Sequence, residues 1–173
     1  MDGVQTGNVK NKENICMRNV LFVCTGNTCR SPMAEAWLRH LCEQDGLDWT
    51  VRSAGLDAFA GDEASLHAQE VIRDAGGDLS HHAARRFTAY LADEADLIVV
   101  MTASHRSRLV SLVPEAADKT FLLMHFSRIN PDSDVPDPFM GTRDAYEKCF
   151  LTMKEAIENL KNSLIENNQP TKG

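Results

Sequence analysis

The residues best suited to chemistry in this sequence lie close together near its start. The thiol of Cys24 is followed six residues later by the guanidinium of Arg30, in the run Cys-Thr-Gly-Asn-Thr-Cys-Arg-Ser-Pro over residues 24–32. A thiolate is a strong nucleophile, and a guanidinium binds two phosphoryl oxygens in one plane. This spacing alone is a weak signal, so its structural setting decides its weight.

The setting of this run is typical of a strand that turns into a helix. An apolar stretch precedes it at 20–23, and the helical spacing of apolar residues follows it at Ala34, Trp37, Leu38 and Leu41. Such a loop directs backbone N–H groups and a positive helix end at one point, which suits an anion. We therefore expect the loop to surround a phosphate through Thr25, Gly26, Asn27, Thr28, Cys29 and Arg30, with its bend at Gly26.

The rest of the chain alternates between strand and helix patterns. Strands are predicted near 19–24, 49–53, 97–101 and 120–123, and helices near 32–44, 62–75, 88–93, 104–112 and 143–166. The pattern predicts one three-layer α/β domain with a four-stranded parallel sheet, in the order 2-1-3-4, and helices on both faces. We expect a flexible N-terminal extension over 1–17, the folded domain over 18–166 and a tail over 167–173.

Composition narrows the class of protein. The 173 residues carry a net charge of −7 with no basic tract, which argues against nucleic acid or an anionic membrane as a partner. No apolar run is long enough to span a bilayer. The five cysteines form neither a disulfide framework nor a zinc pattern, so we expect a cytoplasmic protein with no metal or organic cofactor. We also expect a monomer.

A second functional group is expected in the proline-rich loop over 130–138. A phosphoryl transfer through a cysteine needs an acid for the leaving group and then a base for water, and one carboxylate can serve in turn. The loop offers Asp132, Asp134 and Asp137. Only Asp137 lies between two prolines, whose fixed φ angles stiffen its backbone, so Asp132 and Asp134 are expected to be solvated loop residues.

The motifs, taken together, resemble the low-molecular-weight protein tyrosine phosphatase family. The likeness runs over about 18–165 and includes residues 24–35, Ser53-Ala54-Gly55, His81 and Asp137-Pro138. It implies that Cys24 accepts the phosphoryl group, Arg30 binds it in the transition state and Asp137 is the acid and base. It also implies that Ser31 donates to the Cys24 thiolate and that Asn27 holds the loop open, supported by Ser53 and His81.

Two positions differ from the common tyrosine-directed pattern. Thr28 stands where those enzymes typically have a bulky aliphatic residue, and Phe139 where they usually have tyrosine. Both are similar to the protein-arginine phosphatase branch, which implies phosphoarginine-bearing protein substrates and an opposing protein arginine kinase. Phosphotyrosine remains the alternative. The family also implies a reversible Cys24–Cys29 disulfide, whose alternative is that Cys29 only fills space.

Other classes of protein are less consistent with the sequence. An arsenate reductase would need resolving cysteines further along, and Cys149 stands alone in a helix pattern, while Cys16 and Cys42 look incidental. A catalytically inactive phosphoresidue-binding module would have lost one of the three catalytic groups. Neither of the common glycine-rich nucleotide-binding motifs occurs.

Overall fold

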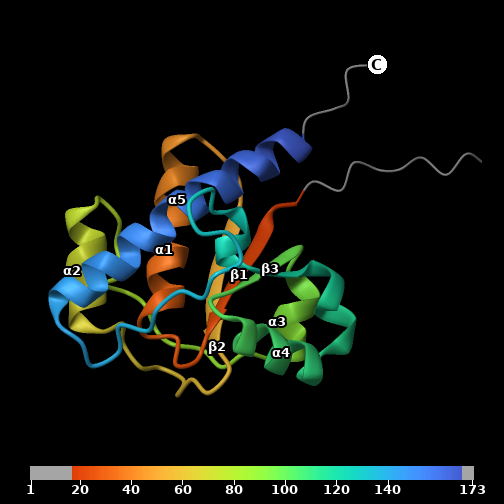
Figure 1. The fold of residues 1–173 in the computed structure, drawn as a ribbon, viewed down its shortest axis with the longest axis horizontal. Coiled ribbons are helices and arrows are strands. Elements are labelled where there is room, and N and C mark those ends of the chain that lie inside the picture. The colour runs from red at the N-terminus through yellow and green to blue at the C-terminus, as the bar shows by residue number, and fades with distance from the viewer. Residues whose placement is uncertain (1–16, 169–173) are drawn as a thin grey trace, which may run out of the picture.

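A parallel sheet forms the centre of the computed structural model, which describes residues 17–168 (Figure 1). Its order, β2-β1-β3-β4, is the one predicted, and all three strand pairs are parallel. The strands are β1 (Asn19–Cys24), β2 (Thr50–Gly55), β3 (Leu97–Val100) and β4 (Thr120–Leu122). The helices are α1 (Arg30–Gln44), α2 (Leu66–Asp74), α3 (Ala89–Glu94), α4 (Ala103–Leu112) and α5 (Arg143–Asn167), with the short 3₁₀ helices η1 (Pro114–Lys119) and η2 (Leu123–Phe126).

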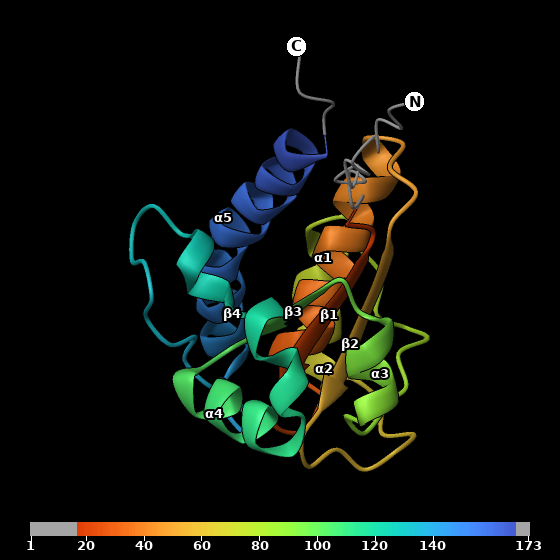
Figure 2. The same ribbon diagram turned by 90° about the vertical axis from the view of Figure 1, so that its right-hand side faces the viewer.

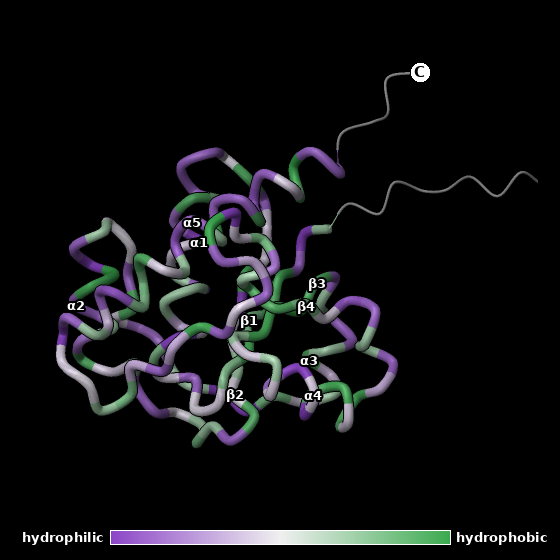
Figure 3. The backbone as a smooth tube through the Cα atoms, viewed as in Figure 1, coloured by the Kyte–Doolittle hydropathy of each residue, from purple (hydrophilic) through white to green (hydrophobic). Residues whose placement is uncertain are grey.

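Each face of the sheet has its own hydrophobic core. Side chains alternate along β1, so Val20 and Phe22 pack with α1, α2 and α5, whereas Leu21 and Val23 pack with α3 and α4. The two helix layers lie on opposite sides of the sheet in Figures 1 and 2. The apolar colour of Figure 3 is concentrated on the central strands, as expected for a parallel sheet covered on both faces.

Several elements begin or end at other residues than predicted. Helix α1 starts at Arg30 rather than Pro32, because a proline is also tolerated within the first turn, where its missing N–H costs no helical bond. Helix α2 starts only at Leu66, since Ser65 has ψ = 144° and is not helical; its N–H donates to Thr28 O in the loop after β1. The helices η1 and η2 were not predicted, because 3₁₀ helices of one or two turns are too short to show apolar periodicity.

The two ends of the described chain meet beside the sheet. Met17 N–H donates to Asn168 Oδ1 at 3.1 Å, and Asn168 Nδ2 donates to Met17 O at 3.2 Å. Met17 therefore belongs to the folded part rather than to the predicted extension, and Asn167 completes α5 rather than opening the tail. The rest of the predicted extension and tail lies outside the described residues. Within 17–168, no helix has the length and apolar character to cross a membrane.

Candidate active site

The nucleophile predicted from the sequence lies at the carboxyl end of β1. Cys24 is 3% exposed, and its Sγ lies 2.8 Å from Ser31 Oγ in the first turn of α1. Ser31 Oγ accepts from Asn27 Nδ2 at 2.9 Å, and its own hydrogen has two acceptors within reach, Ala54 O at 3.5 Å and the nearer Cys24 sulfur. The contact with Cys24 is the one that the family resemblance implies for Ser31.

Asn27 is the residue that holds the loop in shape. It has φ = 56° and no exposed surface. Besides Ser31, its Nδ2 donates to Ser53 Oγ at 2.8 Å, and its Oδ1 accepts from Arg85 N–H at 2.9 Å. The loop bends through residues 25–29, with Gly26 among them as expected, and its left-handed residue is Asn27, whose short side chain tolerates that conformation and replaces the backbone bonds lost there.

The network continues behind the loop. Ser53 Oγ donates to buried Glu35, which also binds Arg39, so Ser53 has the supporting position expected of it. The prediction for His81 is wrong: it is His82 Nε2 that contacts the loop, 2.8 Å from Asn27 O, while His81 is exposed. In an irregular segment, adjacent side chains point apart, and sequence alone does not say which one points inward.

Arg30 and Asp137 meet across a cavity above Cys24. Arg30 Nη2 lies 3.3 Å from Asp137 Oδ2, and Arg30 Nη1 donates to Val135 O at 3.1 Å. Arg30 is 5% exposed, whereas the Asp137 side chain is 52% exposed. The cavity, of about 150 Å³, is lined by Cys24, Thr25, Gly26, Thr28, Cys29, Arg30, Asp137 and Phe139. The structure thus brings together the three predicted catalytic residues with both specificity positions.

The other two aspartates of the loop lie elsewhere. Asp134 accepts from Ala103 N–H at the start of α4, at 2.8 Å, and Asp132 contacts His125 at 3.1 Å. Neither lines the cavity. Their places agree with the expectation that Asp137 alone serves the site.

Opposing influences act on the Cys24 thiol. Burial raises the pKa of Cys24, while the Ser31 hydroxyl, the backbone N–H groups of Ser31 and Asn27, and the charge of Arg30 act to lower it. The helix end and Arg30 therefore favour the thiolate, as expected, but burial outweighs them.

Cys29 lies beside the cavity between two hydroxyl groups. Its Sγ is 2.9 Å from Ser65 Oγ and 3.2 Å from Tyr146 OH. Burial, followed by the contact with Cys29, raises the pKa of Tyr146 to about 12, so Tyr146 remains a neutral phenol. Cys24 and Cys29 are both free thiols, and their disulfide remains a prediction. Ser65 and Tyr146 were missed, because nothing local in the sequence marks them.

His105, in the first turn of α4, is a further residue that sequence reasoning missed. Its Nε2 lies 2.8 Å from Thr25 Oγ1 on the wall of the cavity. Burial, and then the nearby charge of Arg30, lowers the pKa of His105 to about 4, so its ring is neutral near pH 7. Sequence reasoning could not have paired these residues, which are 80 positions apart.

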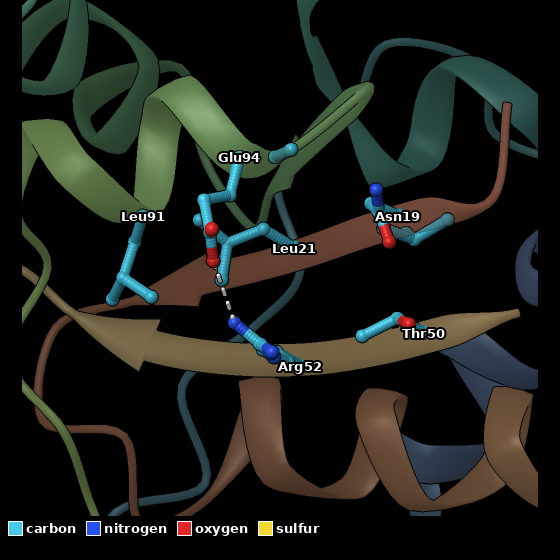
Figure 4. Close-up of a pocket in the computed structure, with 8 residues that line it drawn as sticks. Asn19, Leu21, Thr50, Arg52, Leu91 and Glu94 are labelled. Atoms are coloured by element: carbon cyan, nitrogen blue, oxygen red, sulfur yellow. Dashed lines mark hydrogen bonds and ion pairs between the residues drawn. The ribbon is translucent and has the colours of Figure 1, made fainter.

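A second cavity lies away from this chemistry. It lies beside α3, over the first halves of β1 and β2, and the Arg52–Glu94 ion pair crosses it (Figure 4). Its lining offers no thiol. Among residues 17–168 there is also no cluster of three or more histidine, cysteine or acidic side chains that could hold a metal ion.

A buried thiol at the end of a parallel strand, a buried arginine above it and a carboxylate opposite define a cysteine-dependent phosphatase site. Residues 19–170 match the family model described as low molecular weight phosphotyrosine protein phosphatase, and the chain belongs to this family.

Similar proteins in the family differ in the phosphorylated residue their names give. A protein-arginine-phosphatase of Geobacillus stearothermophilus is 39% identical over 84% of this chain and 95% of its own. A low molecular weight protein-tyrosine-phosphatase of Streptomyces coelicolor is 42% identical over 82% of this chain and 90% of its own. Among solved structures, a YwlE arginine phosphatase mutant with a phosphorylated active-site serine is 36% identical, with a TM-score of 0.80 over 86% of this chain and 96% of that one.

Proposed function

We propose that this protein removes phosphoryl groups from arginine side chains of proteins through a cysteinyl-phosphate intermediate. The Cys24 sulfur attacks phosphorus, and the bond from phosphorus to the guanidinium nitrogen breaks as Asp137 gives that nitrogen a proton. Asp137, now a carboxylate, then removes a proton from water, which attacks phosphorus and releases phosphate and the thiolate. The ion pair between Arg30 and Asp137 supports this assignment, because the proposed acid and the phosphate-binding guanidinium then line the same cavity.

The phosphoryl group is proposed to lie in the loop that follows β1. There Arg30 binds two of its oxygens, in the planar arrangement that a lysine cannot provide. Ser31 stabilises the Cys24 thiolate, as its 2.8 Å contact supports. No cofactor is needed, since the thiolate, the guanidinium and the carboxylate supply every step.

The observation that carries the choice of phosphoarginine is Thr28 on the cavity wall. Thr28 is half-buried and lines the same cavity as Asp137. Its hydroxyl offers a polar contact to a planar group rich in N–H donors, and the Asp137 carboxyl group can both accept from that group and protonate it. The Geobacillus relative, named a protein-arginine-phosphatase, supports this choice. An opposing protein arginine kinase follows from it, and we place the reaction in the cytoplasm, with a monomer as the active unit.

Phosphotyrosine is the second candidate. Phe139, 63% exposed at the mouth of the cavity, could stack on a phenol ring, and the Streptomyces relative is named a protein-tyrosine-phosphatase. Arsenate reduction is disfavoured, because it would need resolving cysteines, and Cys149 lies buried in α5 with its thiol bound to Pro136 O.

The experiment compares kcat/KM for a phosphoarginine-bearing protein and a matched phosphotyrosine peptide. Wild type is expected to prefer phosphoarginine, and Thr28→Ile to shift the preference toward phosphotyrosine, whereas Thr28→Ser retains it. A wild-type preference for phosphotyrosine would replace the substrate proposed here. Activity no higher than that of Cys24→Ser on both substrates would contradict a phosphatase function.

A further inference from the structure

The contact between Thr25 and His105 joins the phosphate-binding loop to α4. Thr25 directly follows the nucleophile, is exposed and lines the cavity. His105 is 6% exposed, and Thr102 Oγ1 accepts from its backbone N–H at the start of α4. A rigid, buried ring therefore lies behind an accessible hydroxyl.

The tautomer of His105 follows from its other ring nitrogen. Nδ1 is buried and has no hydrogen-bond partner among residues 17–168. If Nε2 accepted from Thr25, the hydrogen would reside on Nδ1, as a buried N–H without an acceptor. If Nε2 donates, Nδ1 keeps only an unused lone pair, and orphaned buried N–H groups are the rarer of the two. The geometry favours a ring that donates from Nε2 to Thr25 Oγ1.

The surroundings keep this arrangement in one charge state. The charged groups that act on His105 come from several elements: Arg30 from α1, Asp57 from the segment after β2, Asp134 and Asp137 from the loop before α5, and Arg108 from α4 itself. Burial and the cation of Arg30 oppose a second proton on the ring more than the carboxylates favour it. The ring therefore stays a single, oriented donor in the neutral pH range.

We propose that His105 is a positioning residue: by donating to Thr25 Oγ1 it turns the Thr25 hydroxyl hydrogen toward the phosphoryl group bound above Cys24. Thr25 then contributes a side-chain donor in addition to the backbone N–H groups and Arg30. This inference deepens the proposed function and rests on the phosphoryl group occupying the cavity.

The test measures the Kd of inorganic phosphate by calorimetry, which does not require turnover. Thr25→Val is expected to weaken binding about tenfold, which corresponds to one hydrogen bond to a charged group. His105→Leu is expected to cause the same loss, and the double variant no further loss, because both changes remove one donor. Thr25→Ser and His105→Gln, whose amide nitrogen replaces Nε2, are expected to stay within about threefold of wild type.

Several results would overturn the positioning role. One is phosphate binding by Thr25→Val as tight as that of wild type, and another is losses that multiply in the double variant. A lower Tm of His105→Leu with an unchanged Kd would make His105 merely structural. If His105→Leu does not fold, the comparison of Thr25→Val with Thr25→Ser decides the proposal, because Thr25 is exposed. The proposed phosphatase function is judged separately, from turnover by wild type against Cys24→Ser.

Discussion

On one side of the cavity Asn27 and Ser31 lie in the core with no exposed surface, whereas Asp137, on the other side, leaves half of its side chain in solvent. The Asn27 side chain makes three hydrogen bonds to residues from three parts of the chain. The Asp137 segment is anchored before Asp137 itself: Asp134 accepts from Ala103 N–H, Val135 N–H donates to Met101 O at 2.9 Å, and the Val135 carbonyl accepts from Arg30.

This difference corresponds to the two tasks of the site. A nucleophile and its phosphate clamp must be held in one geometry before substrate arrives, which the buried network achieves. An acid that becomes a base must serve first the leaving group and then water, which suits an exposed carboxyl group on a stiff, proline-flanked segment. The following changes separate the two sides, in order of expected effect.

Arg30→Lys should have the largest effect, because Arg30 touches both sides of the cavity. Lysine cannot bind two phosphoryl oxygens in one plane or reach Val135 O as well, so kcat/KM for p-nitrophenyl phosphate should fall about 10³-fold. Arg52→Lys is the matched control, since Arg52 forms an ion pair at the distant cavity of Figure 4. If Arg30→Lys retained a tenth of the wild-type activity, the proposed binding of two phosphoryl oxygens by Arg30 would be contradicted.

Asp137→Asn should lower kcat about 10²- to 10³-fold, since the amide cannot deliver a proton. The loss should be larger for phenyl phosphate than for p-nitrophenyl phosphate, whose leaving group needs protonation less. Asp132→Asn, in the same loop but outside the cavity, should behave as wild type. Equal losses for both substrates would argue that Asp137 orients the substrate rather than protonating it.

Asn27→Ala should act on stability. It leaves the Arg85 N–H without its acceptor and puts alanine at a positive φ, so unfolding in urea should become easier by about 2–4 kcal/mol. Gly26→Ala is the control: a Cβ there would meet only Thr28 Oγ1, at 3.7 Å, and stability should change by less than about 1 kcal/mol. Similar losses in both variants would mean that the loop is not held through Asn27.

The smallest effect should be on the pH dependence of stability, through the protonation of His105. Its pKa of about 4 lies below the ordinary 6.5, so between these values the unfolded chain binds more protons than the folded one. Stability should therefore decline as pH falls from about 6.5 toward 4, and His105→Gln should remove that part of the decline. Urea midpoints at pH 7 and pH 5 measure it. Identical shifts in wild type and variant would contradict a neutral, buried ring.

The parts of the molecule that sequence predicted are those with local signals. Strands β1 and β3 and helix α5 follow from apolar runs and periodicity, and Cys24 and Arg30 from their place between strand and helix. The proline context singled out Asp137. Contacts such as Cys29 with Tyr146, 117 positions apart, depend on how helices pack across the sheet and leave no local trace. Sequence could not tell whether His81 or His82 contacts the loop, because in an irregular segment the direction of each side chain depends on the local backbone turn.

The paired hydrogen bonds between Met17 and Asn168 have a consequence for how this unit can be combined with others. Because Met17 and Asn168 lie next to each other, the two points at which residues 17–168 would join another protein are as close together as the two ends of a short surface turn. The unit could be spliced into a loop of another protein without forcing the host's flanking segments apart. Such an insertion would carry the whole phosphate-binding loop with it, because that loop is assembled from within these residues.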